Sequence, residues 1–267
     1  MKEFTVREDT TLKTFTDNFY AQASFCFRTL LKAREIRVNG ARVSADMPLK
    51  QGDIVRYFLT PKQESRAAFS VVYEDGNVIV ADKESGVNSE AVFSALCERG
   101  ETYFIHRLDR NTAGLLVFAK NAEAEGELLS AFRDRRVEKI YLARVVGCPK
   151  EKHAVCTAYL KKDAAASRVR VSSKPVGEKI ITEYEVVERG ETSLLRVTLH
   201  TGKTHQIRAH LAFLGFPIVG DEKYGDGAYN RAYNAVRQKL VAKRLTLHCA
   251  GALAYLDGRS FLSSHEV

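Results

Sequence analysis

The feature that most constrains the fold is a series of short strand-like segments after residue 68. They alternate or run apolar with β-branched and aromatic residues, and they cover residues 69–75, 77–83, 114–120, 139–147, 167–173, 181–189 and 193–200. Helical patterns appear at 122–135, 204–214 and 231–243. Because strands and helices do not alternate regularly, the pattern predicts an α+β fold rather than a doubly wound parallel sheet.

A shorter region with its own pattern precedes these strands. Residues 11–34 have helical periodicity, and the segment IRVNGARV predicts a hairpin around Asn39-Gly40. Residues 60–68, which include Pro61, are polar and break the pattern. We therefore expect a small α/β domain at 1–62 and a larger domain at 69–267.

The charge of the chain points to a polyanionic partner. The 267 residues include 41 Lys and Arg against 33 Asp and Glu, a formal net charge of +8. Such an excess raises the local concentration of nucleic acid, although a merely soluble basic protein is the alternative. Five cysteines, an odd number without a C-x-x-C pair, argue against a disulfide framework or a thiolate zinc site. Because the sequence contains no secretory signal or membrane-length apolar run, we expect a cytoplasmic protein.

Cations gather in the helix end and hairpin of the small region. They are Arg28, Lys32, Arg34, Arg37 and Arg42. They are placed to face a phosphate backbone, although a solvated charged face is the common alternative. Residues 34–56, with a VNG turn and the segment LKQGDIV, resemble the small S-four-like RNA-binding domain. That resemblance implies an RNA-binding appendage that orients the substrate.

Three stretches of the larger region carry candidate chemistry. In HRLDR, Asp109 lies between Arg107 and Arg110, which stabilise it as an anion suited to act as a nucleophile or base. A structural Arg–Asp pair is the alternative reading of this stretch. Tyr141 interrupts an apolar strand and is either a core residue or a ring that stacks on a base.

The third stretch, residues 201–225, opens with a turn-to-helix segment rich in hydrogen-bond donors. Lys203, His205, Arg208 and His210 lie close together in it, a composition that suits a phosphate or carboxylate. The histidines at 200, 205 and 210 are five residues apart and do not share a helical face. We therefore expect no zinc site.

In order and approximate spacing, these stretches resemble the RluA-type pseudouridine synthases. The matching segments are HRLDRNTAGLLVFAK, KIYLARVVG and TGKTHQIRAHLAFLGFPIVGDEKYG, and the likeness extends over residues 69–256. It implies a mixed, mostly antiparallel sheet with flanking helices and a central cleft. It also implies an enzyme that isomerises uridines of ribosomal or transfer RNA to pseudouridine. No cofactor or metal is expected, and a monomer suffices.

The resemblance also assigns roles to individual residues. It implies that Asp109 is the catalytic aspartate, that Tyr141 stacks on the target uracil and that Arg208 pairs with the aspartate. It implies that Arg107 holds the flipped-out base or its place in the stem. We further expect His106, Lys203 and His205 to contact the substrate. The sequence departs from the family pattern at Glu84, Asn111, Ala113 and Lys203.

Two other functions remain open on the sequence alone. One is a non-catalytic RNA-binding protein on the same fold. The other is a glycosidic-bond hydrolase, which needs a second acid near Asp109, with Asp221 or Glu138 as candidates. Two further basic stretches are possible RNA contacts: Lys161, Lys162, Arg168, Arg170 and Lys174, and then Arg231, Arg237, Lys239, Lys243 and Arg244. The identity of the RNA is not readable from the sequence.

Overall fold

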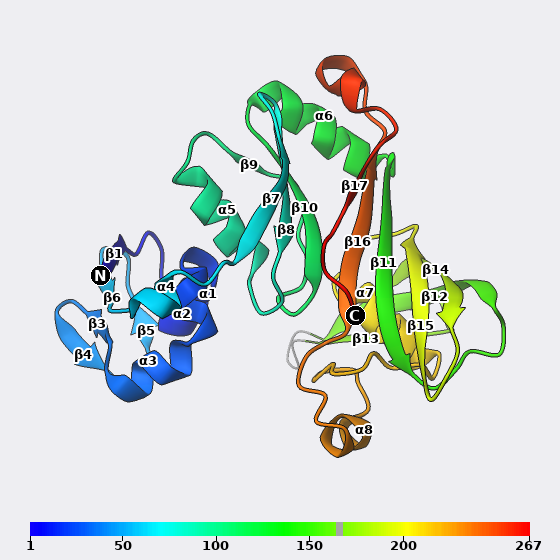
Figure 1. The fold of residues 1–267 in the computed structure, drawn as a ribbon, viewed down its shortest axis with the longest axis horizontal. Coiled ribbons are helices and arrows are strands. Elements are labelled where there is room, and N and C mark those ends of the chain that lie inside the picture. The colour runs from blue at the N-terminus through cyan, green and yellow to red at the C-terminus, as the bar shows by residue number, and fades with distance from the viewer. Residues whose placement is uncertain (164–167) are drawn as a thin grey trace.

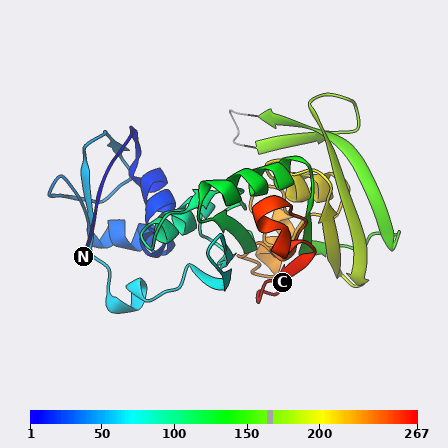
Figure 2. The ribbon, with the colours of Figure 1, turned by 90° about the horizontal axis from the view of Figure 1, so that it is seen from above.

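A computed structural model describes residues 1–163 and 168–267, which form a small N-terminal sheet unit beside one extended sheet (Figure 1). Seen from above, the N-terminal unit lies at one end of the molecule and the strands that follow residue 136 lie toward the other (Figure 2). None of the helices in these described ranges is long and apolar enough to cross a membrane.

The small unit has its own buried core. Its elements are β1 (Lys2–Thr5), β2 (Thr10–Thr11), α1 (Leu12–Phe19), α2 (Ala21–Phe25), α3 (Phe27–Ala33), β3 (Ile36–Val38), β4 (Ala41–Val43), β5 (Pro48–Leu49), β6 (Ile54–Tyr57) and α4 (Pro61–Glu64). The sheet order is β1-β6-β3-β4, and β2 pairs with β5. Leu30, Ile36 and Val55 belong to the core between helices and sheet.

The structure tests two expectations for this unit. The hairpin at Asn39-Gly40 is confirmed, because both residues have positive φ, 49° and 85°, between β3 and β4. The helical pattern expected over 11–34 appears as three short helices, α1, α2 and α3. The backbone leaves the helical conformation at Tyr20 (φ −142°, ψ 88°) and again at Cys26, so the segment is divided into three helices. The break at Tyr20 lets its ring pack edge-on against Tyr57, with 5.4 Å between centroids.

The extended sheet carries the rest of the chain. Across the sheet the strands run β13 (Arg168–Ser172), β12 (His153–Asp163), β14 (Glu178–Glu188), β15 (Thr192–Leu199), β11 (Val137–Val146), β16 (Leu240–Leu247), β10 (Ala113–Ala119), β8 (Val78–Lys83) and β7 (Phe69–Glu74), with β9 (Tyr103–Phe104) on β10 and β17 (Arg259–Leu262) on β16. Among the strand ladders of the described residues, β10–β16 is parallel and the others are antiparallel. The predicted α+β class with a mostly antiparallel sheet is confirmed.

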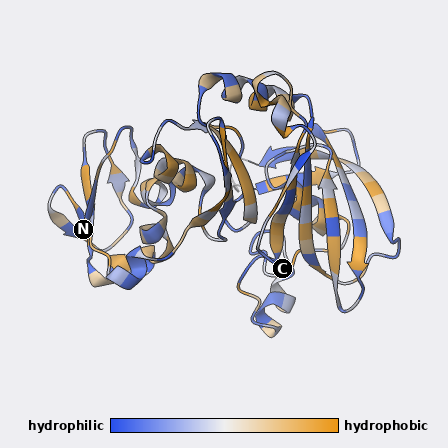
Figure 3. Ribbon diagram, turned by 45° about the horizontal axis from the view of Figure 1, so that its top comes forward, coloured by the Kyte–Doolittle hydropathy of each residue, from blue (hydrophilic) through white to orange (hydrophobic). Residues whose placement is uncertain are grey.

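Strand β10 shows how the sheet separates two cores. Its seven residues are all buried, and successive side chains point to opposite faces. Leu116 and Phe118 join one cluster, whereas Leu115, Val117 and Ala119 join the other. In Figure 3 the hydrophobic residues crowd the central strands and alternate with hydrophilic residues along the outer ones.

Helices cover both faces of the extended sheet. They are α5 (Ser89–Cys97), α6 (Ala122–Arg133), α7 (Gln206–Phe213) and the 3-10 turn η1 (Gly251–Leu256), whereas α8 (Gly227–Ala232) has no buried residue. Residues of α5 and α7 belong to one cluster, and residues of α6 and η1 belong to the other. Asn121 caps α6, because its side chain accepts a hydrogen bond from the backbone of Ala124 at 2.9 Å.

The helices expected at 122–135 and 204–214 correspond to α6 and α7, but the helix expected at 231–243 is wrong. Helix α8 ends at Ala232, and the segment from Leu240 is strand β16, which lies between β11 and β10. Its apolar residues are buried by this pairing, so tertiary contacts override a weak helical pattern. The strand expected at 167–173 appears as β13, and its first residue lies outside the described residues.

Candidate active site

Asp109 lies in a loop whose backbone is held by hydrogen bonds with two buried side chains, Lys83 and Ser89. The loop connects β9 to β10, and the fully buried Lys83 of β8 supports it. The Nζ of Lys83 donates hydrogen bonds to the carbonyl oxygens of Val87 (2.8 Å), Glu84 (3.0 Å) and Arg110 (3.2 Å). Burial lowers the pKa of Lys83 to about 7. Ser89 adds a second anchor, since its Oγ accepts from the backbone N–H of Leu108 at 2.9 Å.

Arg208 of α7 holds the carboxylate of Asp109. Its Nη1 donates to Asp109 Oδ2 at 2.7 Å, while Nε and Nη2 donate to the two oxygens of Asp221 at 2.6 and 3.0 Å. Arg208 and Asp221 are 6 % and 1 % exposed. Burial on its own would raise the pKa of Asp221, but the hydrogen bonds and charge of Arg208 bring it below its ordinary value. Asp221 thus orients the guanidinium, and the guanidinium orients Asp109.

His205 approaches the same carboxylate from the start of α7. It has a left-handed backbone (φ 55°), and its Nε2 lies 3.9 Å from Asp109 Oδ2. The hydroxyl of Tyr224 accepts from the backbone N–H of Val169 at 2.8 Å and lies 2.9 Å from His205 Nδ1. If the Tyr224 hydroxyl donates this hydrogen bond, Nδ1 is the acceptor and the neutral ring carries its proton on Nε2, which faces Asp109. Burial lowers the pKa of His205, which favours the neutral ring.

Tyr141 completes the site from β11. The β11–β16 register shifts between Ile140 and Tyr141, an irregularity of the kind that re-aims a side chain. Tyr141 is buried, and burial together with the charge of Asp109 raises its pKa, so the phenol remains protonated. Asp109, Tyr141 and Arg208 line one pocket of about 640 Å³. Three stretches that are separate in the sequence therefore meet at one site.

The other expected substrate-binding residues line the same pocket. The ring of His106 stacks on Phe132 with centroids 4.5 Å apart, and its Nε2 accepts from a backbone N–H of β10 at 3.2 Å. Burial lowers the pKa of His106 to about 3, so the ring is neutral. Arg107 is largely exposed and pairs with Glu90 at 3.2 Å. Lys203 pairs with a glutamate of β14 at 2.7 Å.

The five cations expected to bind RNA lie elsewhere, on α3 and the β3–β4 hairpin of the small unit. None of them is among the residues that line this pocket. Arg37 stacks over the ring of Phe58 at 4.8 Å, and the other four are exposed. The small unit instead contacts the loop of Asp109 through Arg110, which forms an ion pair with Asp17 and donates to Ser24 Oγ at 3.1 Å.

Sequence reasoning missed the roles of Lys83 and Asp221 in this arrangement. Asp221 was a candidate second acid for a hydrolase, but it is buried and both its oxygens bind Arg208. Glu138, the other candidate, pairs with Arg244 at 3.2 Å and is not among the residues of the Asp109 pocket. Neither carboxylate stands opposite Asp109 as paired-acid hydrolysis requires.

Comparisons with known proteins show the family of this chain. A family model described as RNA pseudouridylate synthase matches residues 77–213. Ribosomal large subunit pseudouridine synthase C of Vibrio parahaemolyticus is 34 % identical over 253 residues, covering 85 % of this chain and 78 % of its own length. Ribosomal large subunit pseudouridine synthase D of Borreliella burgdorferi is 34 % identical over 190 residues, 62 % of this chain and 58 % of its own.

The fold likewise has a solved counterpart. The structure of human RNA Pseudouridylate Synthase Domain Containing 1 superposes with a TM-score of 0.59 at 24 % identity. It covers 74 % of this chain and 90 % of that one. At this identity the likeness concerns the fold.

Proposed function

Since this chain belongs to the RNA pseudouridylate synthase family and is an RNA pseudouridine synthase, we propose that Asp109 is its catalytic residue, with Tyr141 and Arg208 as partners. The observation that carries this assignment is the 2.7 Å hydrogen bond from the buried Arg208 to Asp109, in the pocket that Tyr141 also lines. A carboxylate held in one orientation and kept ionised suits a nucleophile or base.

The reaction breaks the bond between the sugar and ring nitrogen one of uracil and joins the sugar to ring carbon five. Carbon five loses its proton and nitrogen one gains one, so no cofactor is consumed. The uridine must leave its stack to reach Asp109, which costs a few kcal/mol. Asp109 then attacks the anomeric carbon or removes a sugar proton to give a glycal. Tyr141 stacks on the base while it rotates and assists removal of the last proton.

We propose large-subunit ribosomal RNA as the substrate, because the relatives above that are 34 % identical carry that substrate class in their names. The test is pseudouridine mapping of total RNA from cells that express the wild-type chain or Asp109→Asn in place of the native gene. Loss of one or more ribosomal positions supports the proposal. Loss confined to transfer RNA would contradict the substrate while leaving the activity in place.

We propose that residues 1–62 act as an S-four-like RNA-binding domain attached to a catalytic domain at 69–267. The exposed Arg28, Lys32, Arg34 and Arg42 support this role. Because Arg110, next to Asp109, contacts Asp17 and Ser24, RNA bound to the small unit would be presented close to the catalytic loop.

A further inference from the structure

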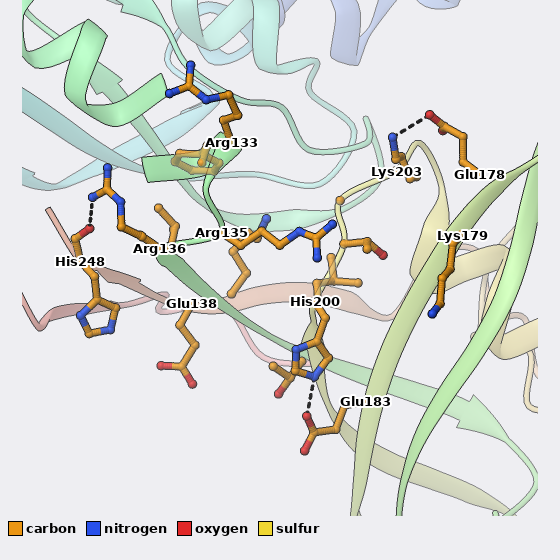
Figure 4. Close-up of a pocket in the computed structure, with 17 residues that line it drawn as sticks. Arg133, Arg135, Arg136, Glu138, Glu178, Lys179, Glu183, His200, Lys203 and His248 are labelled. Atoms are coloured by element: carbon orange, nitrogen blue, oxygen red, sulfur yellow. Dashed lines mark hydrogen bonds and ion pairs between the residues drawn. The ribbon is translucent and has the colours of Figure 1, made fainter. Parts of the chain in front are cut away.

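A second, larger pocket of about 1130 Å³ opens beside the active site (Figure 4). We call it the basic pocket. It shares Phe132, Lys139, Leu199, Gly202 and Lys203 with the pocket of Asp109, so the two cavities meet. The end of α6, strand β11 and the ends of β14 and β15 form its walls.

The charge of the basic pocket is unbalanced. Six Lys or Arg residues line it, against three glutamates. The glutamates already have partners: Glu178 binds Lys203 at 2.7 Å, Glu183 binds His200 at 2.7 Å, and Glu138 binds Arg244 at 3.2 Å. Within residues 1–163 and 168–267, no ion pair is found for three of the cations, which are Arg135, Lys139 and Lys179. The pocket therefore presents positive charge without a counter-charge.

Two cations, Lys139 and Lys203, line both cavities, and among the described residues no ion pair is found for Lys139. Lys139 is partly buried, its Nζ lies 5.4 Å from the centroid of Phe132, and burial lowers its pKa. A desolvated ammonium without a counter-charge is unfavourable, and an anionic ligand would offset that cost. Gly202 leaves room beside it, because a Cβ there would stand 3.4 Å from the Nζ. Lys139 precedes Tyr141 by two residues on β11, and both side chains line the Asp109 pocket.

Arg135 and Lys179 continue the positive charge away from Tyr141. Arg135 follows α6 in a left-handed turn (φ 59°), and its guanidinium extends into the basic pocket (Figure 4). Lys179 reaches in from β14, a different wall. Both residues are exposed. Cations on different walls of the basic pocket suit the evenly spaced phosphates of a nucleic-acid backbone better than they suit a single small anion.

We propose that the basic pocket binds the sugar-phosphate backbone next to the target uridine. Lys139 holds the phosphate closest to Tyr141, and Arg135 and Lys179 hold phosphates further along the strand. This inference rests on the proposed function for the nature of the ligand. It assigns to Lys139 a positioning role, because a phosphate fixed there sets where the base meets the tyrosine ring.

The test compares three variants with wild-type protein on a transcript of large-subunit ribosomal RNA that carries tritium on carbon five of uridine. Arg135→Gln/Lys179→Gln should weaken RNA binding about tenfold and raise KM more than it changes kcat. It should also lower the slope of log affinity against log salt by about two, one for each phosphate that is no longer neutralised. Lys139→Met should raise KM and also lower kcat, and Lys139→Arg should recover most of both.

The matched control is Lys150→Gln/Lys152→Gln, which removes the same charge from two exposed residues outside both pockets. It should leave KM, kcat and the salt slope as in the wild type, and thermal unfolding of every variant should match. Unchanged affinity and salt slope in the Arg135/Lys179 variant would overturn the inference. The inference would also be overturned if binding of a polyglutamate peptide were lost in this variant while binding of RNA was retained. Failure of the proposed function is separate, because it appears as full activity in Asp109→Asn whatever the pocket variants do.

Discussion

Arg208 and Asp109 lie 99 residues apart in the chain and are joined by a hydrogen bond of 2.7 Å. The rest of the guanidinium is committed to Asp221, which holds it through two further hydrogen bonds of 2.6 and 3.0 Å. The orientation of the Asp109 carboxylate therefore depends on a buried partner, Asp221, that does not itself line the pocket.

Replacing Arg208 by Lys tests this arrangement. Lysine keeps the charge, but it lacks the planar guanidinium whose several N–H groups bind both carboxylates. We expect turnover to fall about a hundredfold, since a misplacement of about 1 Å costs that much. The free energy of unfolding should fall by about 3 kcal/mol, because Asp221 loses a buried partner. Tritium release and urea unfolding measure the two effects.

The matched control for Arg208→Lys is Arg144→Lys, at an arginine that pairs with Glu188 near the surface. It should change the free energy of unfolding by less than about 1 kcal/mol. Wild-type turnover in Arg208→Lys would show that the guanidinium is not needed to orient Asp109.

Tyr141→Phe separates the ring from its hydroxyl. The ring is buried in the core that also contains Leu195 and Val197, so the variant should fold normally and still stack on uracil. If the phenol assists the last proton removal, kcat should fall about tenfold or more while KM stays close to the wild-type value. An unchanged kcat would leave the tyrosine with a packing role alone.

The acid stability of the protein should depend on His210. This histidine is fully buried, and burial lowers its pKa from 6.5 to about 4. Between those pH values the unfolded chain binds a proton that the folded chain does not, so the free energy of unfolding falls as the pH drops from 6.5 toward 4. At pH 5 this amounts to about 2 kcal/mol.

Urea unfolding at pH 7.5 and pH 5 measures this dependence. His210→Gln should lose about 2 kcal/mol less than the wild type on acidification, whereas the exposed control His248→Gln should lose as much as the wild type. Equal losses in all three proteins would contradict the assignment to His210.

The cations of the small unit should act on RNA affinity and not on chemistry. Changing Arg28, Lys32, Arg34 and Arg42 together to Gln removes four exposed charges. We expect weaker RNA binding and a salt slope lower by up to about four, with an unchanged melting temperature. If RNA affinity and choice of uridine stay the same, the RNA-binding role of residues 1–62 is wrong.

Local pattern allowed much of the fold to be predicted. The strand segments and the Asn39-Gly40 hairpin follow from alternation and turn chemistry, which depend on neighbouring residues. The segment from 231 to 243 was misassigned, because burial between β11 and β10 decides the conformation of β16. Such pairing across the sheet leaves little trace in a short window of sequence.

The candidate site was likewise predictable in part from the sequence. The motifs named Asp109, Tyr141 and Arg208, and the fold brings them into one pocket. The supports were not predictable, since Lys83 acts through backbone carbonyls and Asp221 through a partner 13 residues away. Arg135 lies outside the matching segments, and the resemblance assigns no role to Lys139, although Lys139 begins the segment KIYLARVVG. The role proposed for them rests on the pairing of the neighbouring glutamates, which depends on the three-dimensional structure.

The central claim is that Asp109 performs the chemistry, and Asp109→Asn tests it most directly. The substitution is nearly isosteric and can still accept a hydrogen bond from Arg208, but an amide is a poor nucleophile and base. The measurement is tritium release from RNA labelled on carbon five of uridine, with RNA affinity and melting temperature as checks on folding. We predict affinity and melting temperature close to the wild type and no detectable release. Release within a few-fold of the wild type would contradict the account.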